Sequence, residues 1–210
     1  MLAQRVQKVQ PSATLGITAK AKAMKAEGIN IVSLGAGEPD FDTPQYIKNA
    51  LSSALDEGFV YYTPTRGIIE LRQAIAEKFG RDNGLTYSPE REILVTPGAK
   101  HALYEAVMAV VNPGDEVLLQ DPSWVSYEPM VQLADGKPVF VPTHEDDGFR
   151  ITPEAVSERI TRKTKAIIIN SPSNPTGGVL RKCELEGIGE LCIDHDLIAI
   201  SDEIYEKILY

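Results

Sequence analysis

The sequence has few cysteines, no long apolar run and no excess of positive charge. Its two cysteines, Cys183 and Cys192, fit neither a zinc pattern nor a disulfide framework, which favours a reducing, cytoplasmic compartment. No stretch has the length of a membrane span, and the first residues lack the apolar run of a signal peptide. The net charge of −9 does not suit a nucleic-acid surface, although it leaves open a small anion in a local pocket. We therefore expect neither a membrane nor nucleic acid as a partner.

Two common site patterns are also missing. The histidines are scattered without ligand spacing, so we predict no metal site and interpret all three as structural or surface residues: His101, His144 and His195. Gly35 and Gly37 follow an apolar segment, as in a dinucleotide fingerprint. However, Asp40 stands where the third glycine belongs, and Pro39 interrupts the backbone donors that a pyrophosphate needs. We therefore reject a dinucleotide site.

Strands and helices alternate from residue 91 onward. The pattern predicts strands at 93–96, 116–120, 138–141, 166–169 and 197–201, and helices at 101–111, 125–134, 153–160 and 181–195. Further helices are expected at 13–27, from Thr43 as N-cap and Pro44 to about residue 57, and along the apolar stripe Ile68, Leu71, Ile75 and Phe79. Such alternation predicts an α/β fold with a mainly parallel sheet.

The segment KAIIINSPSNPTGG, residues 165–178, is the centre of this pattern. Its four residues at 166–169 favour a strand buried on both faces, and the prolines that follow end it in a rigid loop. Asn174 lies in that loop, between two prolines. Taken alone, the loop is better interpreted as an ordinary strand-to-helix connection.

Parallel strands bring the loops at their carboxyl ends to one edge of the sheet, which is where such folds bind ligands. The loops predicted to meet there carry Gly98, Ala99, Lys100, Trp124, Asn174, Asp202 and Tyr205. Each residue alone also has an ordinary structural interpretation, such as a core tryptophan or a helix-capping aspartate. Together they offer a helix N-terminus for a phosphate, a flat face for a ring, two hydrogen-bonding groups for a phenolic oxygen and a carboxylate for a ring nitrogen. This combination describes pyridoxal 5′-phosphate.

The chain resembles the class I aminotransferases of the aspartate aminotransferase type, which are pyridoxal-phosphate enzymes of fold type I. The resemblance extends over essentially the whole length. It rests on GAGEPDFDTP (35–44), YTPTRGI (62–68), PGAKHAL (97–103), NPGDEV (112–117), PSWVSY (122–127), NSPSNPTG (170–177) and SDEIYE (201–206). It implies a three-layer α/β/α large domain, with an arm and small-domain segment at 1–44 and an incomplete cofactor-binding domain at 45–210.

The resemblance also implies roles for single residues. Gly98, Ala99 and Lys100 lie at the phosphate, Trp124 stacks on the ring, Asn174 and Tyr205 bond its phenolic oxygen, and Asp202 pairs with its nitrogen. The residues implied to contact the substrate are Gly37, Lys100, Trp124 and Asn174. Tyr62 reaches the phosphate of the neighbouring subunit in a homodimer.

One family feature is not found in the sequence. The Schiff-base lysine of this family follows the Asp-x-x-Tyr motif by a few tens of residues, so it is expected beyond Tyr210, and Lys207 is too close to Asp202 to replace it. We therefore expect an N-terminal portion that is inactive alone. The family sheet also places two further strands between those at 93 and 198.

The leading hypothesis is a cytoplasmic, homodimeric aminotransferase that moves an amino group from an amino acid to a 2-oxo acid. Lys100 favours acidic substrates of the aspartate and glutamate type, because in related enzymes that carry lysine at this position it can pair with a distal carboxylate; a solvent-facing lysine is an equally weighted interpretation. Two alternatives remain at this stage. One is a lyase or synthase of the same fold, and the other is a non-catalytic ligand-binding or dimerisation fragment.

Overall fold

The structure is a computed structural model that describes residues 3–35, 37 and 41–209. It divides into two compact units, one formed by Met1–Ser12 with Pro97–Tyr210 and the other by Ala13–Thr96. The domain boundary expected at residue 44 remains a prediction. Pro39 and Asp40, on which we based the rejection of a dinucleotide site, lie outside the described residues.

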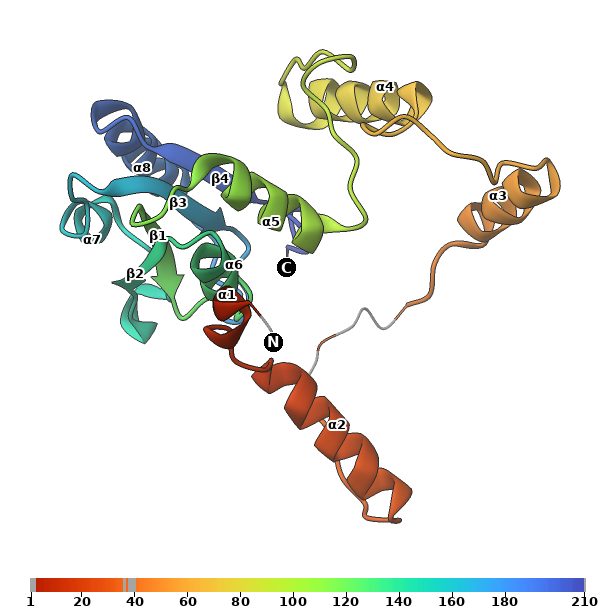
Figure 1. Cartoon of the computed structure of the whole chain (residues 1–210), viewed down its shortest axis with the longest axis horizontal. Coiled ribbons are helices and arrows are strands. Elements are labelled where there is room, and N and C mark those ends of the chain that lie inside the picture. Colours follow the sequence, from red (N-terminus) through yellow and green to blue (C-terminus); the bar gives the residue numbers. More distant parts are fainter. Residues whose placement is uncertain (1–2, 36, 38–40, 210) are drawn as a thin grey trace. The chain divides into compact units, whose positions relative to one another are not determined.

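The first unit contains a parallel four-stranded sheet in the order β2-β1-β3-β4 (Figure 1). Its strands are β1 (Glu116–Asp121), β2 (Lys137–Pro142), β3 (Thr164–Asn170) and β4 (Ile198–Asp202). Its helices are α1 (Gln4–Gln7), α5 (Ala99–Val110), α6 (Tyr127–Leu133), α7 (Pro153–Ser157) and α8 (Lys182–Asp194), with a 3₁₀ turn at Glu145–Asp147. Strand β3 lies inside the sheet, as its uninterrupted apolar sequence predicts.

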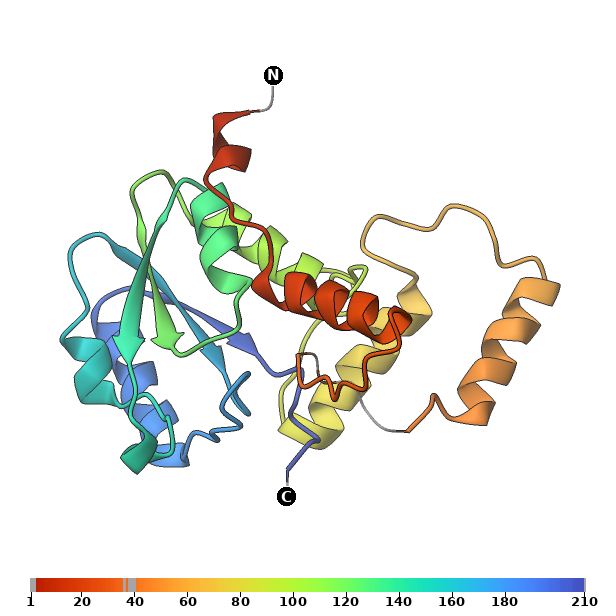
Figure 2. The ribbon, with the colours of Figure 1, turned by 90° about the horizontal axis from the view of Figure 1, so that it is seen from below.

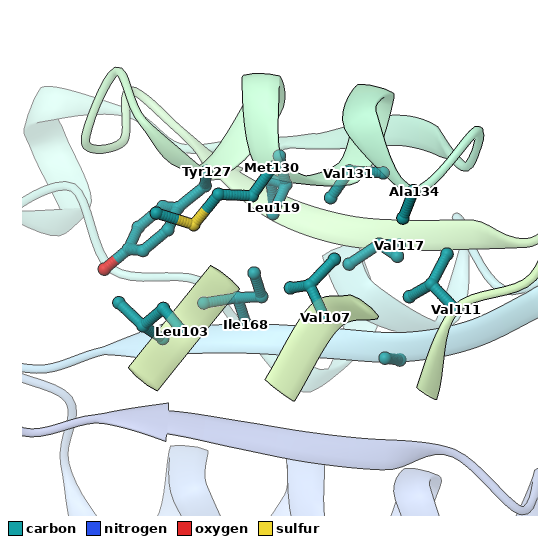
Figure 3. Packing of buried hydrophobic residues seen from close by; sticks show 11 residues of the cluster. Leu103, Val107, Val111, Val117, Leu119, Tyr127, Met130, Val131, Ala134 and Ile168 are labelled. Atoms are coloured by element: carbon teal, nitrogen blue, oxygen red, sulfur yellow. The ribbon is translucent and has the colours of Figure 1, made fainter. Parts of the chain in front are cut away.

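Alternate residues of the two inner strands face opposite sides of the sheet. Val117 and Leu119 of β1, with Ala166 and Ile168 of β3, pack against α5 and α6 in one buried cluster. Figure 3 shows this cluster, to which the helices contribute Leu103, Val107, Tyr127, Met130 and Val131. The helices α5 and α6 therefore form one outer layer.

The opposite face of the sheet has its own core. Leu118, Ile167 and Ile169 point to it and pack with Val156 of α7 and Ile188 of α8. Figure 2 shows α7 and α8 on this side of the sheet and α5 and α6 on the other. The three-layer α/β/α architecture expected from the sequence is confirmed. None of the helices in the described ranges is both long and apolar enough to cross a membrane.

The second unit is helical: α2 (Ala13–Ala26), α3 (Gln45–Asp56), α4 (Ile69–Lys78) and a π-helical turn at Phe79–Asn83. Two details of the sequence prediction were wrong. Thr43 does not cap α3, which begins at Gln45 with Pro44 at the N-cap position. The apolar stripe of α4 is at most half-buried, and Leu71 is exposed; the buried residue of this helix is Arg72.

The predicted strand at 93–96 is also absent. Residues 93–96 have no regular secondary structure, because a strand requires a neighbour with which to form a hydrogen-bonded ladder, and none of the described strands pairs with them. Helix α5 starts at Ala99, two residues earlier than predicted. Gly98 precedes it with φ of +92°, a conformation that glycine adopts without strain.

Candidate functional site

The carboxyl ends of β3 and β4 lie side by side at one edge of the sheet. Asn170 and Asp202 are paired in the β3–β4 register. The side-chain amide of Asn170 donates a hydrogen bond to the backbone carbonyl of Asp202 at 3.0 Å, and its oxygen accepts one from the backbone N–H of Asn174 at 2.8 Å. This one buried amide therefore connects the end of β4 with the loop that follows β3.

The loop after β3 positions the Asn174 side chain. The loop closes on itself because Ser173 donates its backbone N–H to Gly178 and accepts one from Gly177. The Asn174 amide then donates to the hydroxyl of Tyr205 at 3.3 Å. The two groups predicted to bind one phenolic oxygen are therefore direct neighbours.

Asp202 is a buried carboxylate, 8% exposed, at the end of β4. Tyr127 donates its hydroxyl to Oδ2 at 2.7 Å, and the backbone N–H of Ile204 donates to Oδ1 at 3.2 Å. Burial, together with the hydrogen bond to Asp202, raises the pKa of Tyr127 far above its usual value, so this phenol remains a proton donor. Each carboxylate oxygen keeps lone pairs for a further donor.

The N-terminus of α5 supplies an anion-binding end to the site. Gly98 offers no side-chain cap. The backbone N–H groups of the first two residues of a helix have no i→i−4 partner, whereas that of His101 donates to the Gly98 carbonyl at 3.1 Å. These groups and the helix dipole attract negative charge. Ala99 and Lys100, in this first turn, are exposed.

Trp124 connects the two ends. Its ring makes an edge contact with the Tyr127 ring, with centroids 5.3 Å apart, and the Lys100 ammonium lies 5.2 Å from the Trp124 ring centroid. The indole therefore contacts Lys100 in the first turn of α5 on one side and, on the other, Tyr127, the residue that donates to Asp202.

These groups surround a cavity of about 220 Å³ in the first unit. Its lining consists of Ala99, Lys100, Leu103, Trp124, Tyr127, Asn170, Asn174, Asp202, Ile204 and Tyr205. The cavity thus offers an anion site at one end, an aromatic face, two polar groups for an oxygen and a carboxylate for a cationic or protonated nitrogen. Among the residues that the structure describes, no cluster of histidine, cysteine and acidic side chains is arranged to hold a metal.

Six of the predicted cofactor residues line this cavity, and Gly98 adjoins it as the N-cap of α5. Gly37 and Tyr62 belong to the other unit, so their roles remain predictions. Sequence reasoning missed Tyr127 and Asn170. Two signals could have found them: Tyr127 lies three residues after Trp124, and Asn170 is the polar residue that ends the apolar run of β3.

Comparisons with known proteins identify the family of this chain. Residues 29–210 match the family model described as aminotransferase class I and II. The chain is 52% identical over 209 residues to an aspartate aminotransferase of Bacillus subtilis, covering 100% of this chain and 53% of that protein. It is 49% identical to the aspartate/prephenate aminotransferase of Thermus thermophilus, with 100% and 54% covered.

A solved structure with a similar fold is that of aspartate aminotransferase from Thermus thermophilus with maleate. It superimposes with a TM-score of 0.97 at 49% identity, covering 100% of this chain and 55% of that one. The chain thus spans about half the length of the relatives that it matches.

Proposed function

Because this chain belongs to the class I and II aminotransferases, we propose that the protein is an aminotransferase that moves an amino group from an amino acid to a 2-oxo acid. Class I aminotransferases use pyridoxal 5′-phosphate. The observation that carries the proposal is a cavity in which the first turn of α5, the Trp124 ring, the Asn174–Tyr205 pair and the Asp202 carboxylate come together.

The residues of the cavity fit this cofactor. The first turn of α5 suits its phosphate, and Trp124 offers a face to its ring. Asn174 and Tyr205 are neighbours that can bond one oxygen, and the lone pairs of the buried Asp202 carboxylate suit a protonated ring nitrogen. When bound, the cofactor supplies an electron sink for chemistry at the substrate α-carbon. The role of this chain is then to bind and orient the cofactor and to keep its ring nitrogen protonated.

We further propose acidic substrates of the aspartate and glutamate type. Lys100 is the lysine in the lining of the cavity, and its ammonium lies beside the indole face, where it can meet a distal carboxylate. The related Thermus thermophilus structure is described with maleate, which is a four-carbon dicarboxylate. The name of one relative adds prephenate, also a dicarboxylate that carries a keto group, as a second compound to test.

The wider properties of the whole protein belong to the same proposal. They are a Schiff-base lysine a few tens of residues after the motif that joins Asp202 and Tyr205, a homodimer in which Tyr62 reaches the partner's phosphate, a substrate contact from the Gly37 backbone, and a cytoplasmic location. The two unpaired cysteines, Cys183 and Cys192, are consistent with a reducing compartment.

The test is an assay of the whole protein, loaded with pyridoxal phosphate, on L-aspartate and 2-oxoglutarate. We expect glutamate and oxaloacetate to form in equal amounts. The rate with this pair should then be compared with the rate when prephenate replaces 2-oxoglutarate as amino acceptor, and with the rate when L-phenylalanine replaces L-aspartate as amino donor. Consumption of L-aspartate with formation of alanine and CO2, and without formation of glutamate, would instead identify a lyase of the same fold. Cofactor binding without turnover of either kind would identify a binding module.

A further inference from the structure

We propose that Tyr127 is a positioning residue that orients the Asp202 carboxylate toward the cofactor's ring nitrogen, an inference that rests on the proposed function. Tyr127 is 2% exposed and comes from the first turn of α6, whereas Asp202 comes from the end of β4, 75 residues later in the chain. The hydrogen bond of 2.7 Å between them is therefore a tertiary contact between a helix and a strand end.

The geometry holds the carboxylate on both sides. An aspartate side chain rotates about two bonds, so a carboxylate bound through one oxygen alone can still tilt. Here Tyr127 binds Oδ2 and the Ile204 backbone N–H binds Oδ1, which together fix the plane of the carboxylate. The remaining lone pairs are then directed in fixed orientations, one requirement for a short, well-aligned bond to a ligand in the cavity.

Tyr127 also packs against the residue proposed to stack on the cofactor ring. Its own ring meets Trp124 edge-on. In Figure 3, the ring of Tyr127 lies beside Met130 at one end of the apolar cluster, and its hydroxyl oxygen extends beyond that cluster. The ring is thus held by the core, while its hydroxyl serves the site.

The rival interpretation is that Tyr127 is a core residue whose hydroxyl merely needs a partner. The two interpretations differ in one measurable respect. If Tyr127 acts through the Asp202 carboxylate, loss of its hydroxyl weakens cofactor binding only while that carboxylate is present. If Tyr127 acts through packing, the loss has the same effect with any side chain at 202.

The experiment is a double-mutant cycle with Tyr127→Phe and Asp202→Asn in the whole protein. The probe is pyridoxamine 5′-phosphate, which has no aldehyde to react with a lysine, and its dissociation constant is measured by quenching of tryptophan fluorescence. We expect Tyr127→Phe to weaken binding about tenfold or more in the wild-type background, as for hydrogen bonds to charged groups. In the Asp202→Asn background the same change should alter binding less than about threefold.

Tyr104→Phe is the matched control, because Tyr104 packs against the same apolar cluster without lining the cavity. It should leave the dissociation constant unchanged. Equal effects of Tyr127→Phe in both backgrounds, or no effect in either, would overturn the inference. Failure of the wild-type protein to bind either vitamin B6 phosphate would instead overturn the proposed function.

Thermal unfolding provides a second measurement of the same cycle. It is carried out without cofactor on the wild type, the Tyr127→Phe and Asp202→Asn variants and the double variant. The Tyr127→Phe protein carries a buried carboxylate that has lost a donor, whereas the double variant does not. A lower unfolding midpoint for the single variant, or failure of that variant alone to fold, supports the coupling. If the Tyr127→Phe variant and the double variant both fail to fold, Tyr127 acts through packing and the inference is wrong.

Discussion

Asn170 and Asp202 are paired across the β3–β4 ladder, and the side chain of the first donates to the backbone carbonyl of the second at 3.0 Å. The same Asn170 side chain accepts the backbone N–H of Asn174. Two residues proposed to contact opposite parts of the cofactor ring are therefore fixed relative to each other by a third residue that is itself 7% exposed. The Asn170 side chain therefore sets the distance between Asn174 and Asp202 at this junction of β3, β4 and the loop after β3.

Replacing Asn170 by alanine should loosen the junction. The change leaves the backbone groups of Asn174 and Asp202 without their partners, so we expect the free energy of unfolding to fall by about 1–3 kcal/mol. Binding of pyridoxamine 5′-phosphate should weaken about tenfold, because both ring contacts lose their alignment. Urea denaturation and fluorescence titration measure the two effects. Asn112→Ala, at an exposed asparagine outside the cavity, should change neither.

Replacing Lys100 by glutamine should change substrate preference more than turnover of uncharged substrates. Loss of a charge-assisted bond to a distal carboxylate is expected to lower kcat/KM for aspartate about tenfold or more, while that for phenylalanine changes less than about threefold. Steady-state kinetics on the two substrates measures the difference. Lys182→Gln is the matched control, since Lys182 also opens a helix but lies outside the cavity. An equal loss on both substrates would mean that Lys100 contacts something other than the distal carboxylate.

The carboxylate of Glu184 should make stability depend on acid pH. Burial alone would raise the pKa of Glu184, but hydrogen bonds from the Arg181 side chain and backbone and from Arg150 together lower it below its ordinary value of 4.5. A carboxyl group whose pKa is lowered by folding stabilises the protein above its unfolded-state pKa, and this stabilisation is lost as the pH falls through the folded-state value.

We therefore expect Glu184→Gln to lower the free energy of unfolding at pH 7 by about 1–2 kcal/mol, and to lower it less at acid pH, once the pH falls through the lowered pKa of Glu184. Urea unfolding at pH 7, 5, 4 and 3 tests this. Glu186→Gln is the control, because Glu186 lies in the same helix with an exposed side chain. A difference between wild type and Glu184→Gln that stayed constant with pH would show that the ion pairs do not cause it.

Two glycine substitutions should have opposite effects. A Cβ at Gly178 would lie 2.8 Å from the carbonyl oxygen of Gly148, so Gly178→Ala must shift either the loop that carries Asn174 or the segment at Gly148 that packs against it. We expect it to destabilise the protein by about 1–3 kcal/mol and to weaken cofactor binding. Gly189 lies in α8 with open space at its Cβ position, so Gly189→Ala should stabilise by about 0.5–1 kcal/mol and leave binding unchanged. Thermal unfolding and fluorescence titration compare the two.

Local sequence patterns predicted most of the first unit. The apolar run before Asn170 predicted β3, and Thr152-Pro153 marks the start of α7, where the Thr152 hydroxyl accepts the Ala155 N–H. These elements follow from the conformational preferences of neighbouring residues, which can be recognised in the sequence alone. The strand expected at 93–96 was wrong for the complementary reason, because a strand depends on a neighbour that its own residues do not specify.

The sequence by itself determined that strand-end residues of the right chemistry would gather at one sheet edge, since parallel strands have that geometry whatever their contacts. Only the tertiary structure decided how those residues are held. The hydrogen bonds of Tyr127 to Asp202 and of Asn170 to Asn174 depend on where α6, β3 and β4 pack against one another. Local periodicity carries no information about such contacts, because it fixes which face a side chain occupies and not which distant side chain it meets there.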